Sequence, residues 1–324
     1  MNAEMEVYKP KNPVRVVTAT SLFDGHDAAI NIMRRILQDT GVEVIHLGHN
    51  RSVQEIVDAA IEEDVQGVAV SSYQGGHIEF FKYLVDLLKE REAPHIKVFG
   101  GGGGVIVPEE IRILESYGVT KIYSPEDGAR LGLQGMVNHI VECLDFSTVK
   151  EDGISFEDLA PQCKLRVANL ITAAEQAKAR EDGHLAALRA EMAKKIGGRK
   201  TPVIGITGTG GAGKSSLTDE VILRILHDLK DIHVAVISCD PSRRKTGGAL
   251  LGDRIRMNVI GNPRLYLRSL ATRQSPSEIP AVLPDAVAAL KAAGFDLIIA
   301  ETAGIGQGDS SIADLVDISI YVMT

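Results

Sequence analysis

The glycine-rich run at residues 208–215, Gly-Thr-Gly-Gly-Ala-Gly-Lys-Ser, constrains the fold of this chain more than any other feature. It follows an apolar segment directly, and it matches the spacing Gly-x-x-x-x-Gly-Lys-Ser. Such a loop needs a strand before it and a helix after it, because its amides and the positive end of the helix must face phosphate groups together. The residues expected to contact the nucleotide are Gly208, Gly210, Gly211, Ala212, Gly213, Lys214, Ser215 and Ser216. Lys214 would reach the β and γ phosphate oxygens and Ser215 would coordinate magnesium, so the sequence predicts a magnesium-nucleotide site.

The rest of the chain alternates short β-branched runs with amphipathic stretches, which is typical of a parallel sheet covered by helices. The first half offers five strands, at 14–18, 42–46, 67–71, 97–99 and 121–123. The second half offers four strands, at 202–207, 233–238, 296–300 and 318–323. We therefore expect an α/β fold with two doubly wound domains, whose ligand-binding loops lie at the carboxyl ends of the strands.

The strand rhythm stops at residues 146–200, where a stretch rich in Ala, Glu, Lys and Arg predicts a helical linker ended by Gly197 and Gly198. A chain of 324 residues is long enough for two domains, which we place at 1–145 and 201–324. We expect the second domain to be incomplete, because the chain stops on an apolar strand that a sheet would normally bury.

Composition excludes several classes of protein. Hydrophobic residues make up 44% of the chain and charged residues 24%, which is typical of a soluble α/β protein. The sequence has no apolar run of membrane-spanning length and no secretory hydrophobic region at its start, so we expect a cytoplasmic protein without membrane contacts. A net charge of −8 argues against a nucleic-acid partner. The three widely spaced cysteines fit neither a disulfide framework nor a zinc site.

The loop after the first predicted strand presents His26 two residues after Asp24. An aspartate in this place can hold one ring nitrogen while the other coordinates a metal, which fixes the tautomer of the imidazole. No second ligand cluster lies nearby, so a metal would have to arrive inside a cofactor that fills its remaining positions. The alternative is that Asp24 caps the following helix and that His26 is an ordinary exposed loop residue.

Two further loops at strand ends consist of small residues. Ser71 ends the third predicted strand, and five consecutive glycines at 100–104 follow the fourth. Glycines let the backbone approach a bulky ligand closely, and Ser71 can form a hydrogen bond with a group lying between sheet and helix. The alternative is a flexible turn.

Together these loops resemble the cobalamin-binding domain of the methylmalonyl-CoA mutase and isobutyryl-CoA mutase families, over roughly residues 14–143. Their Asp-x-His-x-x-Gly motif matches Asp24 and His26 with Ala29 in place of glycine, and their Ser-x-Leu matches Ser71 with Tyr73 in place of leucine. The resemblance implies a Rossmann or flavodoxin-like domain that binds adenosylcobalamin base-off, with His26 as the axial cobalt ligand and the dimethylbenzimidazole tail near Ser71. The cofactor-binding residues that it implies are Asp24, His26, Asp27, Ser71, Gly102, Gly103 and Gly104.

A magnesium nucleotide needs carboxylates at strand ends, and Asp240 and Glu301 both follow apolar strands. Between them, the segment at 246–257 adds a further carboxylate, Asp253, and a basic residue, Arg256, for phosphate. Each of these residues taken alone could equally be a helix cap or a member of a surface ion pair.

As a group, these segments resemble the G-protein chaperones that accompany adenosylcobalamin-dependent acyl-CoA mutases. Those proteins carry Asp-Pro-Ser, Gly-Gly-x-x-Leu-Gly-Asp-x-x-Arg-Met and Glu-Thr-x-Gly-x-Gly-Gln. The resemblance implies a magnesium shell of Ser215, Asp240, Asp253 and Glu301. It also implies that Lys214 and Glu301 are catalytic, that Arg256 faces phosphate, and that Gln307 to Asp309 belong to a switch. GTP or GDP as the nucleotide rests on this resemblance alone, because no Asn-Lys-x-Asp motif occurs.

A cobalamin domain placed before a G domain resembles the fused isobutyryl-CoA mutases, whereas methylmalonyl-CoA mutase places its cobalamin domain after the substrate barrel. The resemblance implies radical interconversion of isobutyryl-CoA and n-butyryl-CoA, with GTP hydrolysis gating cofactor delivery. The acyl-CoA would bind a barrel that these residues lack, and the full-length protein would be a homodimer. The alternative is a stand-alone corrinoid carrier or sensor with a nucleotide switch and no mutase activity.

Overall fold

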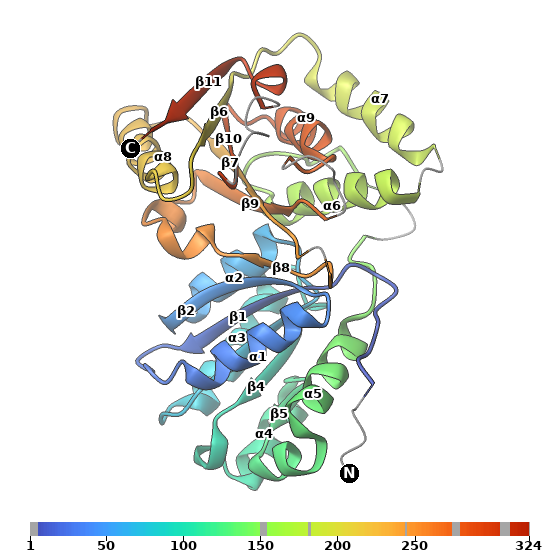
Figure 1. Cartoon of the computed structure of the whole chain (residues 1–324), viewed down its shortest axis with the longest axis vertical. Coiled ribbons are helices and arrows are strands. Elements are labelled where there is room, and N and C mark those ends of the chain that lie inside the picture. Colours follow the sequence, from blue (N-terminus) through green and yellow to red (C-terminus); the bar gives the residue numbers. More distant parts are fainter. Residues whose placement is uncertain are drawn as a thin grey trace. The chain divides into compact units, whose positions relative to one another are not determined.

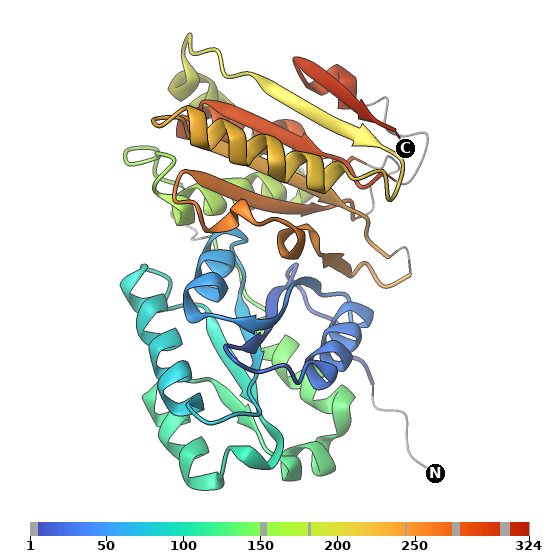
Figure 2. The same cartoon turned by 90° about the vertical axis from the view of Figure 1, so that its left-hand side faces the viewer.

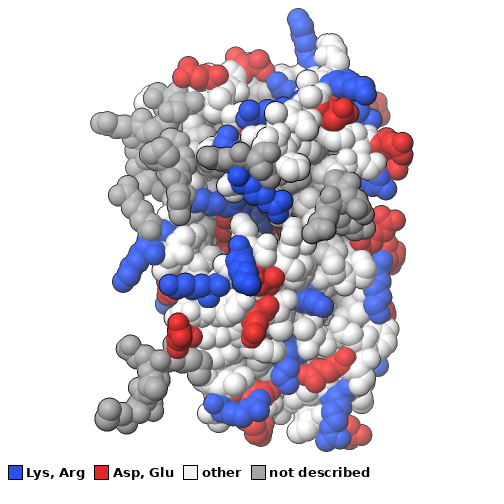
Figure 3. Space-filling view, turned by 90° about the vertical axis from the view of Figure 1, so that its right-hand side faces the viewer, with Lys and Arg blue, Asp and Glu red and all other residues white. Residues whose placement is uncertain are grey.

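The computed structural model describes residues 6–149, 154–180, 183–243, 245–273, 279–304 and 312–323 (Figure 1). The chain divides into two compact units, each with its own sheet. The first unit comprises residues 1–61, 65–148 and 243–250, and the second comprises residues 62–64, 149–242 and 251–324. Within the described ranges, no helix has both the length and the apolar character needed to cross a membrane. Acidic and basic side chains are interspersed over the face that Figure 3 shows.

The first unit is built on a sheet with the strand order β5-β4-β3-β1-β2-β8. Its strands are β1 (Arg15–Ser21), β2 (Glu43–Arg51), β3 (Gly67–Ser71), β4 (Lys97–Gly101), β5 (Lys121–Tyr123) and β8 (Ala249–Leu251). Its helices are α1 (Ala28–Asp39), α2 (Val53–Glu62), α3 (His77–Glu90), α4 (Pro108–Tyr117) and α5 (Pro125–Leu144), with a 3-10 turn at Gly103–Val105. The ladders that join β1 to β5 are parallel, so the carboxyl ends of these strands share one edge.

Helices cover both faces of this first sheet. On one face α1 and α5 contact each other, and Leu37 and Ile140 from these helices share a buried cluster with Phe99 of β4. Phe81 of α3 lies on the other face, because a Cβ added at Gly100 would come within 2.5 Å of the Phe81 ring. Consecutive strand residues point to opposite faces of a sheet. A space between β4 and the helices α1 and α5 is therefore separate from any space next to α3.

The second unit has a five-stranded sheet with the order β11-β6-β10-β7-β9 and parallel pairing throughout. Its strands are β6 (Val203–Gly208), β7 (Val234–Asp240), β9 (Leu265–Ala271), β10 (Leu297–Glu301) and β11 (Ile318–Val322). Its helices are α6 (Lys164–Arg180), α7 (His184–Ile196), α8 (Lys214–Asp228) and α9 (Leu283–Ala293), with 3-10 turns at Asp253–Arg256 and Val259–Gly261. The predicted α/β class with two parallel sheets is confirmed.

Helix α8 covers one face of this second sheet, as Figure 2 shows. Its Ile222 and Leu226 share a buried cluster with Ile206 of β6 and Val236 of β7. The other face carries α6, α7 and α9, which contact one another. The strands β6, β10, β7 and β9 are therefore buried on both sides, which explains their nearly continuous apolar sequences, whereas the edge strand β11 is largely exposed.

Residues 146–200, expected as a helical linker, contribute α6 and α7 to the second unit. Leu170 of α6 and Met192 of α7 belong to the same buried cluster as Leu290 of α9. The two helices are therefore part of a packed core, because each has an apolar face that α9 covers.

Strand β8 was absent from the expected strands, and so was β9, although all seven residues of β9 are buried. Its centre holds Arg268, whose side chain is fully buried and donates to Glu175 at 3.0 Å and to Thr172 at 2.9 Å. The arginine interrupts the apolar pattern that identifies a buried strand in a sequence, while its partners on α6 balance its charge in the fold.

Candidate functional site

The loop between β1 and α1 holds His26 by a single buried carboxylate. Asp24 is 1% exposed, and its Oδ1 lies 2.8 Å from His26 Nδ1 and accepts the His26 backbone N–H at 2.9 Å. Its Oδ2 accepts the backbone N–H of Tyr73, from the loop after β3, at 2.5 Å. The contact with Asp24 fixes the His26 ring at Nδ1. Because the His26 side chain is 76% exposed, its Nε2 faces solvent. This arrangement suits an imidazole that coordinates a metal through its Nε2.

The charged form of Asp24 is favoured by these contacts. Burial acts to raise the pKa of this carboxyl, but the backbone N–H groups of Tyr73 and His26 outweigh it and hold the pKa below its usual value. Asp24 does not cap α1, since the residue in the cap position is Asp27, which makes no side-chain capping bond. The geometry thus favours the hypothesis that Asp24 orients His26 as a metal ligand over the alternative that Asp24 caps the helix. Asp27 itself is half-buried.

A cleft of about 330 Å³ opens between the sheet and the helices α1 and α5. The strands β3 and β4 supply Ser71 and Gly101, which lie opposite each other in the parallel ladder. The hydroxyl of Ser71 lies 3.2 Å from that of Thr20, and the residue is 6% exposed. Ala29 and Tyr73, the two departures from the cobalamin motifs, also line the cleft. Tyr73 stands beside His26, with 5.8 Å between ring centroids, so the cleft lies next to the exposed imidazole.

The glycine run supplies part of the wall of this cleft. Of the three glycines expected to contact the cofactor, Gly102 and Gly103 line the cleft, whereas Gly104 is exposed and lies outside the lining. A side chain at Gly102 would collide with the carbonyl oxygen of Ser72, and Gly103 has a positive φ of 55°. At both positions, any residue other than glycine would strain or displace the backbone of this loop. Gly101 differs, because a Cβ there would meet only the Tyr123 carbonyl oxygen, at 3.6 Å.

Most of the cleft was missed by reasoning from the sequence. Its walls are apolar side chains of α1, α5 and β4, among them Ile30, Met33, Leu37, Phe99, Leu133, Met136 and Ile140. Each of these residues fits an ordinary core position, so the only signal in the sequence was the small-residue loops that open the cleft.

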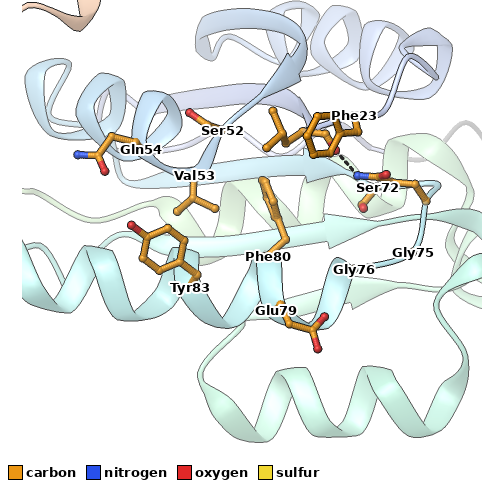
Figure 4. A pocket seen from close by; sticks show the side chains of 12 residues that line it. Phe23, Ser52, Val53, Gln54, Ser72, Gly75, Gly76, Glu79, Phe80 and Tyr83 are labelled. Atoms are coloured by element: carbon orange, nitrogen blue, oxygen red, sulfur yellow. Dashed lines mark hydrogen bonds between the residues drawn. The ribbon is translucent and has the colours of Figure 1, made fainter.

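A second cavity, of about 560 Å³, lies next to α2 and α3 (Figure 4). Phe23, Phe80 and Tyr83 bring three aromatic rings to it, and Glu79 supplies a carboxylate. Phe23 has a positive φ of 64° and is 81% exposed, and its N–H donates to Asn50 at 2.8 Å. No residue of the predicted site lines this second cavity.

In the second unit, the loop between β6 and α8 has the conformation of a phosphate-binding loop. Gly208, Gly211 and Gly213 have positive φ angles of 140°, 79° and 89°, which residues with a side chain rarely adopt. Lys214 is 6% exposed, and its Nζ donates to the carbonyl oxygens of Gly208 at 2.9 Å and Thr209 at 3.0 Å. The ammonium group therefore lies over its own loop, where phosphate oxygens would meet it.

The first turn of α8 is tied to the end of β10. Ser215 Oγ donates to Glu301 Oε1 at 2.6 Å, and Thr218 Oγ1 donates to Oε2 at 3.0 Å. Glu301 is 2% exposed, and burial raises the pKa of its carboxyl although both hydroxyls oppose this. Ser215 and Glu301, both predicted magnesium residues, are thus brought together. Thr218 was not predicted, since its role depends on this contact across 83 residues.

Asp240 at the end of β7 has a buried Oδ2 without a hydrogen-bond partner. Burial, followed by the charge of Asp253, raises the pKa of this carboxyl well above its usual range. Asp253 accepts a hydrogen bond from the Ser238 hydroxyl and another, at 3.2 Å, from the Arg256 guanidinium. A divalent cation would compensate the unpartnered oxygen, so the residues present fit a magnesium ion.

The carboxylates do not form a complete metal cage. Within the described ranges, no three His, Cys, Asp or Glu side chains are close enough to hold a metal ion by themselves. Magnesium is usually held by one or two carboxylates together with phosphate oxygens and water, and Ser215 with Glu301 suits such a site. Arg256, expected to face phosphate, donates to Asp253, and the predicted switch at 307–309 lies outside the described residues.

Comparison with known proteins gives each unit a family. The model of the B12 binding domain matches residues 14–129, and that of the methylmalonyl Co-A mutase-associated GTPase MeaB matches residues 167–324. The chain is 60% identical to the fused isobutyryl-CoA mutase of Geobacillus kaustophilus (strain HTA426), over 98% of this chain and 30% of that protein. It is also 60% identical to the fused isobutyryl-CoA mutase of Cupriavidus metallidurans, over 97% of this chain and 28% of that protein. The chain is therefore a homologue of the fused isobutyryl-CoA mutases that carries a B12-binding domain and a MeaB-type GTPase domain and spans about 30% of their length.

Proposed function

We propose that the first unit binds adenosylcobalamin through His26 and that the second unit binds and hydrolyses magnesium GTP. The observation that carries the cobalamin half is the buried Asp24 carboxylate 2.8 Å from His26 Nδ1, which leaves Nε2 of an exposed ring for cobalt. The nearby cleft of about 330 Å³ would take the nucleotide tail, with Ser71 in its wall. Both features lie at the carboxyl edge of the first sheet, where open α/β sheets bind ligands.

In the second unit, the residues of the phosphate-binding loop would hold the nucleotide. Lys214 would move from the carbonyls of Gly208 and Thr209 to the phosphate oxygens, and Ser215 would bind magnesium beside Glu301. Guanine as the base is supported by the match to the MeaB GTPase family. Glu301 would hold the magnesium-bound water or Ser215 in position through its two oxygens.

We further propose that the whole protein interconverts isobutyryl-CoA and n-butyryl-CoA, and that GTP hydrolysis gates delivery of its cofactor. Bound adenosylcobalamin would supply the radical chemistry for the carbon-skeleton shift. The residues described above would bind the cofactor, hold its cobalt through His26 and exclude water from its tail. The support for this activity is the identity to fused isobutyryl-CoA mutases, of which the chain spans about 30%.

The cobalamin half is tested by His26→Ala, with His49→Ala as the control. His49 is also exposed, lies in the same unit and lines neither cavity. We expect the wild type and His49→Ala to convert adenosylcobalamin to a base-off, histidine-bound spectrum, and His26→Ala to lose this spectrum and to bind about tenfold or more weakly. Unchanged affinity and an unchanged spectrum in His26→Ala would refute the axial role of His26.

The nucleotide half is tested by Lys214→Ala, with the exposed Lys230→Ala as the control. We expect magnesium-dependent hydrolysis of GTP in preference to ATP by the wild type and by Lys230→Ala, and a loss of about 100-fold or more in Lys214→Ala. Equal hydrolysis of ATP and GTP would contradict the choice of guanine without affecting the cobalamin proposal.

A further inference from the structure

The cleft between the sheet and the helices α1 and α5 is almost entirely hydrocarbon. Its floor is formed by Ala69 and Phe99, and its helix walls are aliphatic. Leu37 is fully buried, and Ile30 and Met136 are 4% and 8% exposed. A planar ring system that enters this space leaves water and meets few polar groups.

Four of the described lining residues carry a hydroxyl group: Ser71, Tyr73, Tyr123 and Ser124. Two of these hydroxyls have hydrogen-bond partners in the protein, and a third belongs to a residue at the mouth of the cleft. Tyr123 OH lies 2.6 Å from His139 Nδ1, and Ser124 Oγ accepts from the backbone N–H at the start of α5. Tyr73 stands at the mouth, beside His26. The remaining hydroxyl is that of Ser71.

Ser71 can offer one hydrogen to a ligand. Its Oγ lies 3.2 Å from Thr20 Oγ1, and either oxygen could donate in this pair. When Thr20 donates, the hydrogen of Ser71 is free to point into the cleft. Inside its mouth, where Tyr73 stands, the described wall therefore has one uncommitted side-chain hydroxyl, at the sheet surface, and its other side chains are mostly hydrocarbon.

These features lead to an inference that rests on the proposed cobalamin site. We propose that the cleft selects corrinoids whose nucleotide base is a benzimidazole over corrinoids whose base is a purine. A benzimidazole that has left cobalt carries one free ring nitrogen, which a single donor satisfies, and the rest of its edge is C–H or methyl. Adenine adds two further ring acceptors and an amino group, and inside the mouth of the cleft no described lining residue has a second uncommitted side-chain hydroxyl to meet them. Each unmet polar group weakens binding by roughly tenfold.

The selectivity is measured by titrating the 324-residue chain with three corrinoids and following the visible spectrum. The probes are cobalamin with its dimethylbenzimidazole, a cobamide with adenine in the same place, and cobinamide, which has no base. We expect cobalamin to bind about tenfold or more tightly than the adenine cobamide. If cobalamin and the adenine cobamide bind with affinities within threefold of each other, the selectivity inference is wrong. That result would not contradict the proposed cobalamin site. Failure of all three corrinoids to bind would overturn the proposed function as well.

Two variants test the physical basis of the selectivity. Met136→Gln keeps the volume of a buried wall residue and adds an amide, so it should narrow the preference for cobalamin by about tenfold. The control is Ile113→Gln, on the exposed side of α4 and outside the cleft, which should leave the ratio unchanged. Ser71→Ala should weaken cobalamin binding about tenfold and leave cobinamide binding unchanged. An unchanged ratio in Met136→Gln, or equal losses for cobalamin and cobinamide in Ser71→Ala, would contradict the polar mismatch.

Discussion

Single buried carboxylates organise both candidate sites. In the first unit, Asp24 accepts hydrogen bonds from two loops and fixes the ring of His26. In the second unit, Glu301 accepts the hydroxyls of Ser215 and Thr218. A carboxylate has acceptor positions for several donors, so one residue can position groups that come from different strands.

The stability of the nucleotide-free second unit should depend on pH through Asp240. Burial raises the pKa of this carboxyl above its ordinary value of 3.8, so the folded state binds the proton more tightly than the unfolded state. The free energy of unfolding therefore falls as pH rises from that ordinary value through the raised pKa. In magnesium-free buffer, we expect the Tm of Asp240→Asn minus that of the wild type to increase by a few degrees from about pH 5 to about pH 8. Thermal unfolding by circular dichroism measures this, and a difference that is constant with pH would contradict it.

Gly304 should tolerate no side chain. It has a positive φ of 70°, and an added Cβ would lie 2.5 Å from the Gly208 carbonyl oxygen and collide with Lys214 Nζ. The lysine end could move away, but the backbone oxygen belongs to the phosphate-binding loop. We expect Gly304→Ala to weaken nucleotide binding about tenfold or more and to lower the free energy of unfolding by about 1–3 kcal/mol.

The control for this variant is Gly261→Ala, where an added Cβ meets no atom within 4 Å. Fluorescent-nucleotide titration together with urea unfolding compares the two proteins. Wild-type nucleotide affinity in Gly304→Ala would show that the close approach of this glycine to Lys214 has no bearing on binding.

At the scale of elements, the carboxyl ends of parallel strands gather the residues of each site. The alternation of strands and helices predicted this edge correctly, since it depends on local sequence patterns. Strand β9 and the helices of residues 146–200 departed from expectation for different reasons. The buried Arg268 hid β9, because its neutralising partners on α6 are distant in sequence. The stretch at 146–200 suggested a linker, because its Ala-rich helices show their apolar faces only weakly until α9 covers them.

The packing of α6 predicts a large effect of core truncation there. Leu170 is fully buried in the cluster that α6 shares with α7 and α9. We expect Leu170→Ala to lower the free energy of unfolding by about 2–5 kcal/mol. Leu223→Ala on α8, where the side chain is 52% exposed, should cost less than about 1 kcal/mol. Urea unfolding followed by circular dichroism compares the two, and equal small losses would mean that α6 is a linker after all.

At the scale of the whole molecule, each unit carries its own sheet and its own candidate site. We expect the 324-residue chain to bind a corrinoid and a magnesium nucleotide but not to convert isobutyryl-CoA to n-butyryl-CoA, because the described residues form two open parallel sheets and no barrel. Chromatography of the acyl-CoA products after incubation with adenosylcobalamin and GTP measures this. Formation of n-butyryl-CoA by this chain would contradict the division of labour proposed here.

The sequence alone determined the phosphate-binding loop and the Asp24–His26 pair, because both depend on residues close together in the chain. The tertiary structure alone decided the apolar cleft, whose wall residues Met33 and Met136 come from different helices and resemble ordinary core residues. It also showed the direct hydrogen bond from Ser215 to Glu301 across 86 residues, which the family resemblance had predicted only as shared membership of a magnesium shell. Such contacts depend on how elements pack, and spacing along the chain carries no information about them.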